Sequence, residues 1–165
     1  QVINMALILE DGSGLTNSNT YVLEVTFNTW LSDRGLTLGS STPVEALLLQ
    51  SMDYLETLSY IGCKNTQEQA LQWPRSYVEI DGFAFPTDSI PKQLIDAQMQ
   101  TAYSIDQGAN PMATVGQAVK KEKVDVIEVE YQDGTISQST ITAVNKTLSK
   151  ILLSNGYSFT ANLSI

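Results

Sequence analysis

Hydrophobic residues recur three or four positions apart in several stretches of the chain. Positions spaced in this way share one face of a helix, so they predict amphipathic helices. The predicted helices cover residues 21–31, 43–60, 91–106 and 143–153. For the second helix, Thr42, Pro43 and Glu45 predict a capping box at the start, and Gly62 predicts the end. For the third, Asp88 or Ser89 is the expected cap.

Other stretches have the spacing of strands. We expect Ala6 to Leu9 to form a short strand or a docked arm. The Asp81-Gly82 turn predicts a small hairpin formed by the two short apolar runs on either side of it. A larger hairpin is expected at about 117–142, with strands Gln117 to Tyr131 and Thr135 to Thr142. The predicted fold is therefore α+β and mainly helical: a small helical bundle with this hairpin and extended terminal arms.

One domain accounts for most of the chain. We predict that residues 1–153 form a single helix-rich domain with an N-terminal arm. We predict that residues 154–165 form a C-terminal tail, because they have no core pattern of their own. Trp73 precedes a proline and lies between two predicted helices, so we interpret it as an anchor of the fold. Arg75 is expected to pair with a nearby carboxylate.

The composition argues against catalysis. The chain has no histidine, which removes the usual general base and the commonest metal ligand, and Cys63 is the single cysteine. We interpret Cys63 as a small packing residue. Asp125, Glu128 and Glu130 fit a solvated strand edge better than a metal site. We therefore predict no enzyme, no cofactor, and no catalytic, cofactor-binding or metal-binding residues. No apolar window is long enough to predict a membrane span.

The charge bears on nucleic-acid binding. Eighteen acidic and nine basic residues give a net charge of −9, and such a surface should repel DNA. Lys120, Lys121 and Lys123 form a basic cluster, but acidic residues interrupt and follow it. Trp30, Trp73 and the tyrosines could stack on bases, although lysine and arginine are few.

A series of short motifs resembles one known family. The motifs are Leu7 to Leu15 (LILEDGSGL), Asn19 to Val22 (NTYV), Ala70 to Arg75 (ALQWPR), Ile90-Pro91, Val119 to Val124 (VKKEKV) and Val129 to Tyr131 (VEY). Their order resembles tailed-bacteriophage proteins often labelled DnaT-like single-stranded DNA-binding proteins. The resemblance extends from Met5 to Leu153. We interpret the proteins of this family as head–tail connectors, also called neck, adaptor or head-completion proteins.

This resemblance implies a structural protein of the virion. Connectors of this kind assemble as a ring, typically of twelve copies, at the junction between portal and tail. The implied partners are other copies of the chain, the portal protein and tail or tail-completion proteins, while packaged DNA passes through an acidic channel. The implied location is the head–tail junction, after synthesis in the host cytoplasm. Two alternatives stay open: a single-stranded nucleic-acid-binding module, and a tail-completion protein lower in the tail.

Overall fold

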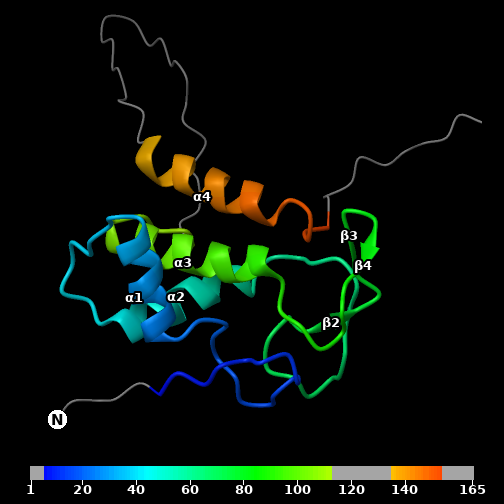
Figure 1. The fold of residues 1–165 in the computed structure, drawn as a ribbon. Helices are drawn as coiled ribbons and strands as arrows, with labels where there is room; N and C mark the ends of the chain where they lie inside the picture. Colours follow the sequence, from blue (N-terminus) through cyan, green and yellow to red (C-terminus); the bar gives the residue numbers. More distant parts are fainter. Residues whose placement is uncertain (1–5, 113–134, 154–165) are drawn as a thin grey trace, which may run out of the picture.

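The computed structural model describes residues 6–112 and 135–153 (Figure 1). Within these residues the fold is α+β and mainly helical, as the hydrophobic pattern predicts. The helices are α1 (Glu24–Asp33), α2 (Val44–Leu55), α3 (Lys92–Asp106) and α4 (Thr135–Leu148). The strands are β1 (Cys63–Lys64), β2 (Arg75–Ser76), β3 (Glu79–Ile80) and β4 (Phe83–Ala84). No helix in the described part of the chain is both long and apolar enough to cross a membrane.

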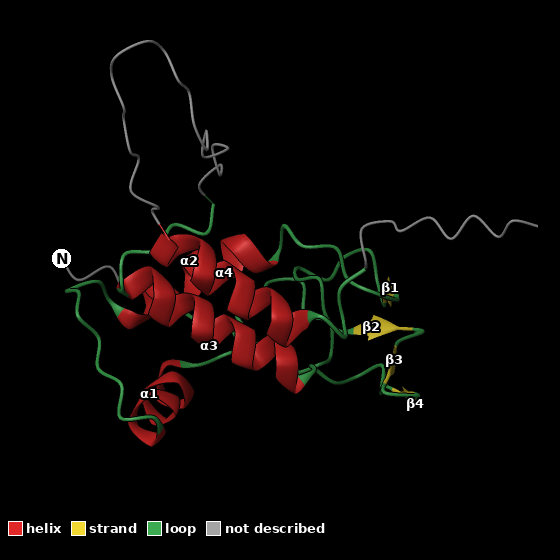
Figure 2. Ribbon diagram, turned by 90° about the horizontal axis from the view of Figure 1, so that it is seen from above, coloured by secondary structure: helices red, strands yellow, loops and turns green. Residues whose placement is uncertain are grey.

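The helices and the strands occupy opposite ends of the molecule. Helix α3 packs against both α2 and α4, and α1 contacts α2. Figures 1 and 2 both show the strands gathered beyond one end of the helices. The strands form two separate antiparallel pairs, β1 with β2 and β3 with β4. We call residues 61–64 and 75–85 the β end.

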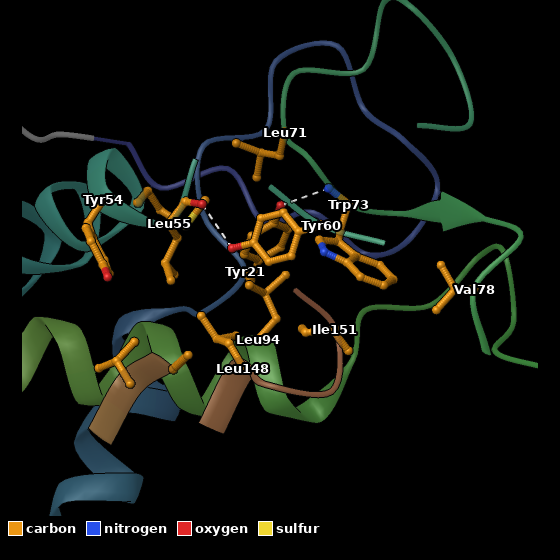
Figure 3. Close-up of a cluster of buried hydrophobic side chains, with 13 residues drawn as sticks. Tyr21, Tyr54, Leu55, Tyr60, Leu71, Trp73, Val78, Leu94, Leu148 and Ile151 are labelled. Atoms are coloured by element: carbon orange, nitrogen blue, oxygen red, sulfur yellow. Dashed lines mark hydrogen bonds between the residues drawn. The ribbon is translucent and has the colours of Figure 1, made fainter. Parts of the chain in front are cut away.

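Trp73 lies at the centre of the core that joins these two parts. Its side chain is 0% exposed, and it packs edge-on against Tyr60 and Phe85 (Figure 3). Leu94 of α3 and Leu148 of α4 belong to the same buried cluster. The predicted role of Trp73 as an anchor of the fold is therefore confirmed. A second cluster fills the space among α1, α2 and α3.

The first three helices and the small hairpin form where predicted, but α1 begins at Glu24 rather than at residue 21, and α2 ends at Leu55 rather than near residue 60 before Gly62. The predicted caps are also wrong. Pro43 is the N-cap of α2 and Pro91 is the N-cap of α3, and neither helix has a side-chain capping bond. The expected capping box of Thr42 and Glu45 therefore does not form. Proline at the N-cap places each helix start one residue later than predicted.

The predicted hairpin at about 117–142 is contradicted over its second half. Thr135 to Thr142, predicted as a strand, lies in α4 instead. Val144 and Leu148, farther along the same helix, are buried in the core, so the helix that they anchor extends back through a segment rich in Thr and Ile that by itself favours a strand. Residues 113–134 lie outside the described residues, and the predicted first strand, Gln117 to Tyr131, falls among them.

The N-terminal stretch is a docked arm that a buried carboxylate organises. Leu9 makes an isolated parallel bridge to Thr20, so Ala6 to Leu9 is not a regular strand. Glu10 is 2% exposed, and its carboxylate accepts four hydrogen bonds. The donors are the backbone N–H groups of Gly12, Gly14 and Leu15 and the hydroxyl of Ser18. The conspicuous motif around Glu10 is therefore structural.

Asp106, at the end of α3, holds the loop before α2. Its carboxylate accepts hydrogen bonds from the Gly39 N–H at 2.7 Å, from the Ser40 N–H at 3.0 Å and from the Ser40 hydroxyl at 2.6 Å. Burial raises the pKa of the Asp106 carboxyl, but the hydrogen bonds from Ser40 and Gly39 outweigh burial and hold the pKa below its ordinary value. The ionised carboxylate therefore stabilises this loop.

Replacing Asp106 by Asn is expected to lower the free energy of unfolding by about 1–3 kcal/mol at pH 7, because charge-assisted bonds are lost. A carboxyl with a lowered pKa in the folded state stabilises at pH values above its unfolded pKa, and this contribution is lost as the pH falls through the folded pKa. The difference in unfolding free energy between the wild type and Asp106→Asn should therefore begin to shrink below about pH 4 and disappear only below the lowered folded pKa. Asp53→Asn, at an exposed position of α2, is the control. A constant difference between pH 7 and pH 3 would contradict this role.

Candidate nucleic-acid interface

Tyr77 is the most exposed aromatic residue of the described chain. It connects β2 to β3, its side chain is 92% exposed, and its backbone φ is 59°. The left-handed region is unfavourable for a tyrosine by roughly 1–2 kcal/mol. The conformation persists because the neighbours are fixed: Ser76 pairs with Cys63, and Val78 is buried in the core. The fold therefore holds a bulky aromatic ring in solvent at a local energetic cost.

Phe83 is the second exposed aromatic residue. It opens β4 directly after the tight turn at Asp81 and Gly82, where both residues have positive φ. Its side chain is 77% exposed, although its register partner Ile80 packs against the core. Every other aromatic side chain in the described residues is buried or half-buried. Both exposed aromatic rings therefore belong to the β end.

Arg75 makes the β end rigid. Its guanidinium donates five hydrogen bonds, three of them to the carbonyls of Tyr60, Ile61 and Gly62 and two to Gln72. The shortest bonds run from Nε to the Ile61 carbonyl at 2.7 Å and from Nη2 to the Gly62 carbonyl at 2.8 Å. The expected ion pair with a carboxylate is not formed within the described residues. Arg75 instead binds carbonyl oxygens of the two segments that directly precede β1 and β2.

Glu56 also fixes the segment before Arg75, by a hydrogen bond to the backbone of Gln72. The Glu56 carboxylate accepts hydrogen bonds from the Gln72 N–H at 3.0 Å and from the Tyr21 hydroxyl at 3.2 Å. The Tyr21 hydroxyl in turn accepts a hydrogen bond from the backbone N–H of Trp73 at 3.1 Å, as Figure 3 shows. Burial raises the pKa of the Glu56 carboxyl, and the same cause raises the pKa of Tyr21. The Gln72 to Arg75 segment is therefore part of the scaffold that positions Tyr77.

Two exposed lysines lie at or against the β end. The Lys64 Nζ, on β1, donates to the Gln69 carbonyl at 3.1 Å. The Lys150 Nζ, just after α4, lies 2.8 Å from the Asp81 carboxylate in the β3–β4 turn. Both lysine side chains reach solvent. The β end therefore combines two exposed aromatic rings with two amino groups, on a molecule whose overall charge is −9.

The residues singled out from sequence are not brought together at this surface. Trp73 is 0% and Trp30 is 9% exposed, so neither indole is available for stacking as the structure stands. Cys63 is exposed, so its interpretation as a packing residue is wrong. The basic cluster at Lys120, Lys121 and Lys123 and the carboxylates Asp125, Glu128 and Glu130 lie outside the described residues. Among the residues described, no group of His, Cys, Asp and Glu could hold a metal ion.

Sequence reasoning missed Tyr77 and Phe83 as surface residues. The available indication was local: Phe83 follows a two-residue turn directly, and the tip of a hairpin is usually exposed. Tyr77 carried no such indication. Alternation along a strand places Tyr77 and buried Val78 on opposite faces, but it does not say whether the face of Tyr77 is covered.

The comparisons with known proteins give one family. A family model described as "Putative DnaT-like ssDNA binding protein" matches residues 5–164. No curated protein and no solved structure matches the chain. The family description is of single-stranded DNA binding, and nothing found points to a head–tail connector, so the connector interpretation of the resemblance is wrong. The partners, the location and the absence of enzymatic activity stay predictions. Because the match covers nearly the whole sequence, the chain belongs to the family of putative DnaT-like ssDNA-binding proteins.

Proposed function

We propose that this protein binds single-stranded DNA at its β end. The observation that carries the proposal is the placement of Tyr77 and Phe83, the two exposed aromatic residues of the described chain, at one end of the molecule. The family description supports the choice of ligand. Proteins that bind single strands without sequence preference combine aromatic side chains, on which bases stack, with amino groups that meet the phosphates.

Stacking is the main source of affinity in this proposal. Each base that stacks on an aromatic ring contributes about 1–3 kcal/mol, and every base offers a flat face. The left-handed backbone at Tyr77 fits this role, because strained residues held by a rigid surround are typical of binding sites. Arg75 and Glu56 fix the segment before Tyr77, and Val78 is buried directly after it, so little ordering is needed on binding.

The phosphates would meet Lys64 and Lys150. The Lys150 ammonium is paired with Asp81, and both groups are more than half exposed, so this pair is weak and a phosphate can compete for it. The remaining surface is acidic, which disfavours duplex DNA more than a single strand because the duplex has the higher charge density. With two phosphates neutralised, the logarithm of the affinity should fall with the logarithm of the salt concentration with a slope of about 1.4.

Replacing Tyr77 or Phe83 by Ala is expected to weaken binding of a labelled oligothymidylate about tenfold each, from the loss of one stacked base. Fluorescence anisotropy at low salt measures the affinity. Val25→Ala, which removes an exposed apolar side chain from α1, is the matched control and should bind as the wild type does. Equal affinity for duplex and single-stranded DNA, or a Tyr77→Ala/Phe83→Ala double variant with wild-type affinity, would contradict the proposal.

Tyr77→Gly separates binding from folding. Glycine adopts φ near 59° without strain, so this variant should be at least as stable as Tyr77→Ala, yet it lacks the ring. A variant that melts no lower than the wild type and binds about tenfold more weakly places the ring in the interface.

A further inference from the structure

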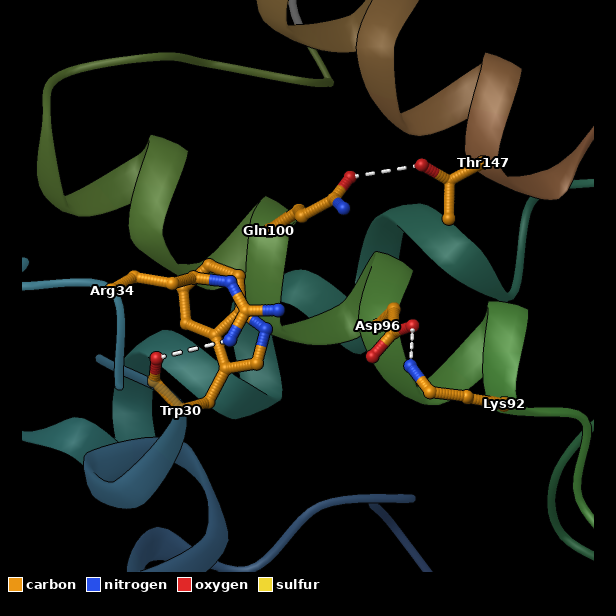
Figure 4. Close-up of polar contacts among 6 residues, drawn as sticks. All are labelled: Trp30, Arg34, Lys92, Asp96, Gln100 and Thr147. Carbon is orange, nitrogen blue, oxygen red and sulfur yellow. Dashed lines mark hydrogen bonds and ion pairs between the residues drawn. The ribbon is translucent and has the colours of Figure 1, made fainter. Parts of the chain in front are cut away.

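Glu56 carries a carboxylate without a direct counter-ion. The residue directly follows α2, its side chain is half-buried, and no ion pair within the described residues includes it. Other carboxylates meet a lysine directly: Asp96 contacts Lys92 one turn away on α3 (Figure 4), and Asp81 contacts Lys150. The C-terminal end of a helix is also the negative end of its dipole, which disfavours a carboxylate there.

A cation is reached only through Gln72. The Gln72 N–H donates to the Glu56 carboxylate at 3.0 Å, and the Arg75 Nη1 donates to the Gln72 carbonyl at 3.2 Å and to its side-chain oxygen at 3.0 Å. One residue therefore bridges a carboxylate and a guanidinium. Because this residue begins the segment that leads to Tyr77, the charge of Glu56 is tied to the surface proposed to bind DNA.

The titratable and charged groups that face Glu56 come from four parts of the chain. The Tyr21 hydroxyl, before α1, donates to the carboxylate at 3.2 Å, and Tyr60 lies nearby, after α2. The positive charges are Lys64 of β1 and Arg75 of β2. Burial raises the pKa of the Glu56 carboxyl, although its hydrogen bonds and these two cations lower it. Glu56 therefore binds a proton at a higher pH than an ordinary glutamate does.

The composition makes such a proton easy to recognise. The chain has no histidine, which is the side chain that ordinarily titrates between about pH 5 and 8. Ordinary aspartate and glutamate carboxyls have pKa values of about 4. A proton that the folded protein takes up at about pH 6 therefore indicates a carboxyl with a raised pKa.

A bound strand would change the surroundings of this carboxyl. Phosphates that meet Lys64 bring negative charge toward Glu56, and like charges disfavour an ionised carboxylate. Conversely, a proton on Glu56 removes a negative charge that opposes the phosphates and leaves the charges of Lys64 and Arg75 without their counter-charge. The two effects are one coupling free energy, seen first from the carboxyl and then from the strand.

We propose that Glu56 takes up a proton when a single strand binds at the β end, so that mild acid strengthens binding. The inference rests on the proposed binding of single-stranded DNA and adds its regulation. The sign follows from linkage, because the bound state holds the proton more tightly than the free state. The gain in affinity is therefore complete below the pKa of free Glu56 and is lost as the pH rises through the pKa of the complex.

The test compares the affinity for a ten-residue oligothymidylate at about pH 7.5 and about pH 5.5, at constant salt, by fluorescence anisotropy. Neither thymine nor the phosphodiester titrates in this range. We expect the wild type to bind about fivefold more tightly at the lower pH. Glu56→Gln keeps an oxygen that accepts the Gln72 N–H but cannot ionise, so it should bind tightly at both pH values.

Glu79→Gln is the matched control. It removes a negative charge from an exposed position of β3, at the same end of the molecule, and should keep the pH dependence of the wild type. Calorimetry at about pH 6 in two buffers of different ionisation enthalpy counts the protons directly. We expect proton uptake on binding in the wild type and in Glu79→Gln, and none in Glu56→Gln. A merely structural role of Glu56 would change the affinity but not the number of protons.

The outcomes separate this inference from the proposed function. Oligonucleotide binding with the same pH dependence in Glu56→Gln as in the wild type would overturn the role of Glu56 and leave binding at the β end intact. Without oligonucleotide binding at either pH the proposed function fails, and inorganic pyrophosphate then decides. Pyrophosphate binding with proton uptake that Glu56→Gln abolishes would keep Glu56 as the proton acceptor of an anion site, and its absence would overturn it.

A measurement on the wild type keeps the inference testable if Glu56→Gln does not fold. Carbon-detected NMR of the Glu56 carboxyl gives its pKa with and without the oligonucleotide. A pKa that rises on binding supports the inference, and a pKa that is unchanged overturns it.

Discussion

Replacing Trp73 by Ala is expected to lower the free energy of unfolding by about 3–5 kcal/mol, because a fully buried indole is removed and a cavity is left behind. The indole is 0% exposed and contacts the Tyr60 and Phe85 rings edge-on, with centroids 6.1 and 5.9 Å away. It also lies in the cluster that joins α3 and α4 to the β end. A loss of this size is a large fraction of the stability of a typical domain.

Urea unfolding, followed by circular dichroism, measures this effect. Trp73→Phe should cost less, because it keeps an aromatic ring and the lost indole N–H has no partner among the described residues. Trp73→Ala with wild-type stability would show that Trp73 is not an anchor of the core. If such a variant also lost DNA binding, Trp73 would belong to an interface.

Replacing Arg75 by Met is expected to lower the free energy of unfolding by about 3 kcal/mol, since the side chain keeps its length but leaves buried carbonyls without donors. Five hydrogen bonds are lost, and they link the carbonyls of Tyr60, Ile61 and Gly62 to Gln72. The effect should be strongest at the β end, where Arg75 holds β1 and β2 together. Amide hydrogen exchange of Lys64 and Ser76 should therefore accelerate more than that of α2.

Arg75→Lys tests whether geometry or charge matters. An ammonium cannot reproduce the planar fork that serves several carbonyls, so most of the stability loss should remain. Arg34→Met, which removes an exposed guanidinium, is the matched control and should cost less than about 1 kcal/mol. If Arg75→Lys were as stable as the wild type, the positive charge rather than the hydrogen-bond geometry would hold the segment.

The difference between the predicted hairpin and the observed α4 shows where local patterns fail. The sequence from Thr135 to Thr142 is rich in residues that favour strands, yet it is helical. Intrinsic propensities differ by only about 0.7 kcal/mol per residue among ordinary amino acids. Burial of Val144 and Leu148, on the part of α4 that packs against α3, contributes more than this, and the helix that they anchor continues back to Thr135.

Exposure decided the candidate site, and exposure is a tertiary property. Trp73 and Tyr77 are four residues apart in one segment, but one is 0% and the other 92% exposed. Each ring has one polar and one apolar neighbour, and although the proline after Trp73 indicated an anchor, nothing in the sequence indicated that the Tyr77 ring is exposed. Arg75 and the left-handed backbone at Tyr77 set the direction of the chain. The Trp73 ring therefore lies in the core, and the Tyr77 ring lies in solvent.

By itself, the sequence determined the elements whose physical causes are local. These are the helices with regular apolar spacing, the turn at Asp81 and Gly82, and the exclusion of histidine-based chemistry by composition. The tertiary structure decided what depends on residues far apart in the chain: the helical state of residues 135–142, the carbonyl partners of Arg75, and the gathering of exposed aromatic rings at the β end. The reason is that each of these is set by burial and by hydrogen bonds between distant segments, which are stronger than the local preferences of the residues involved.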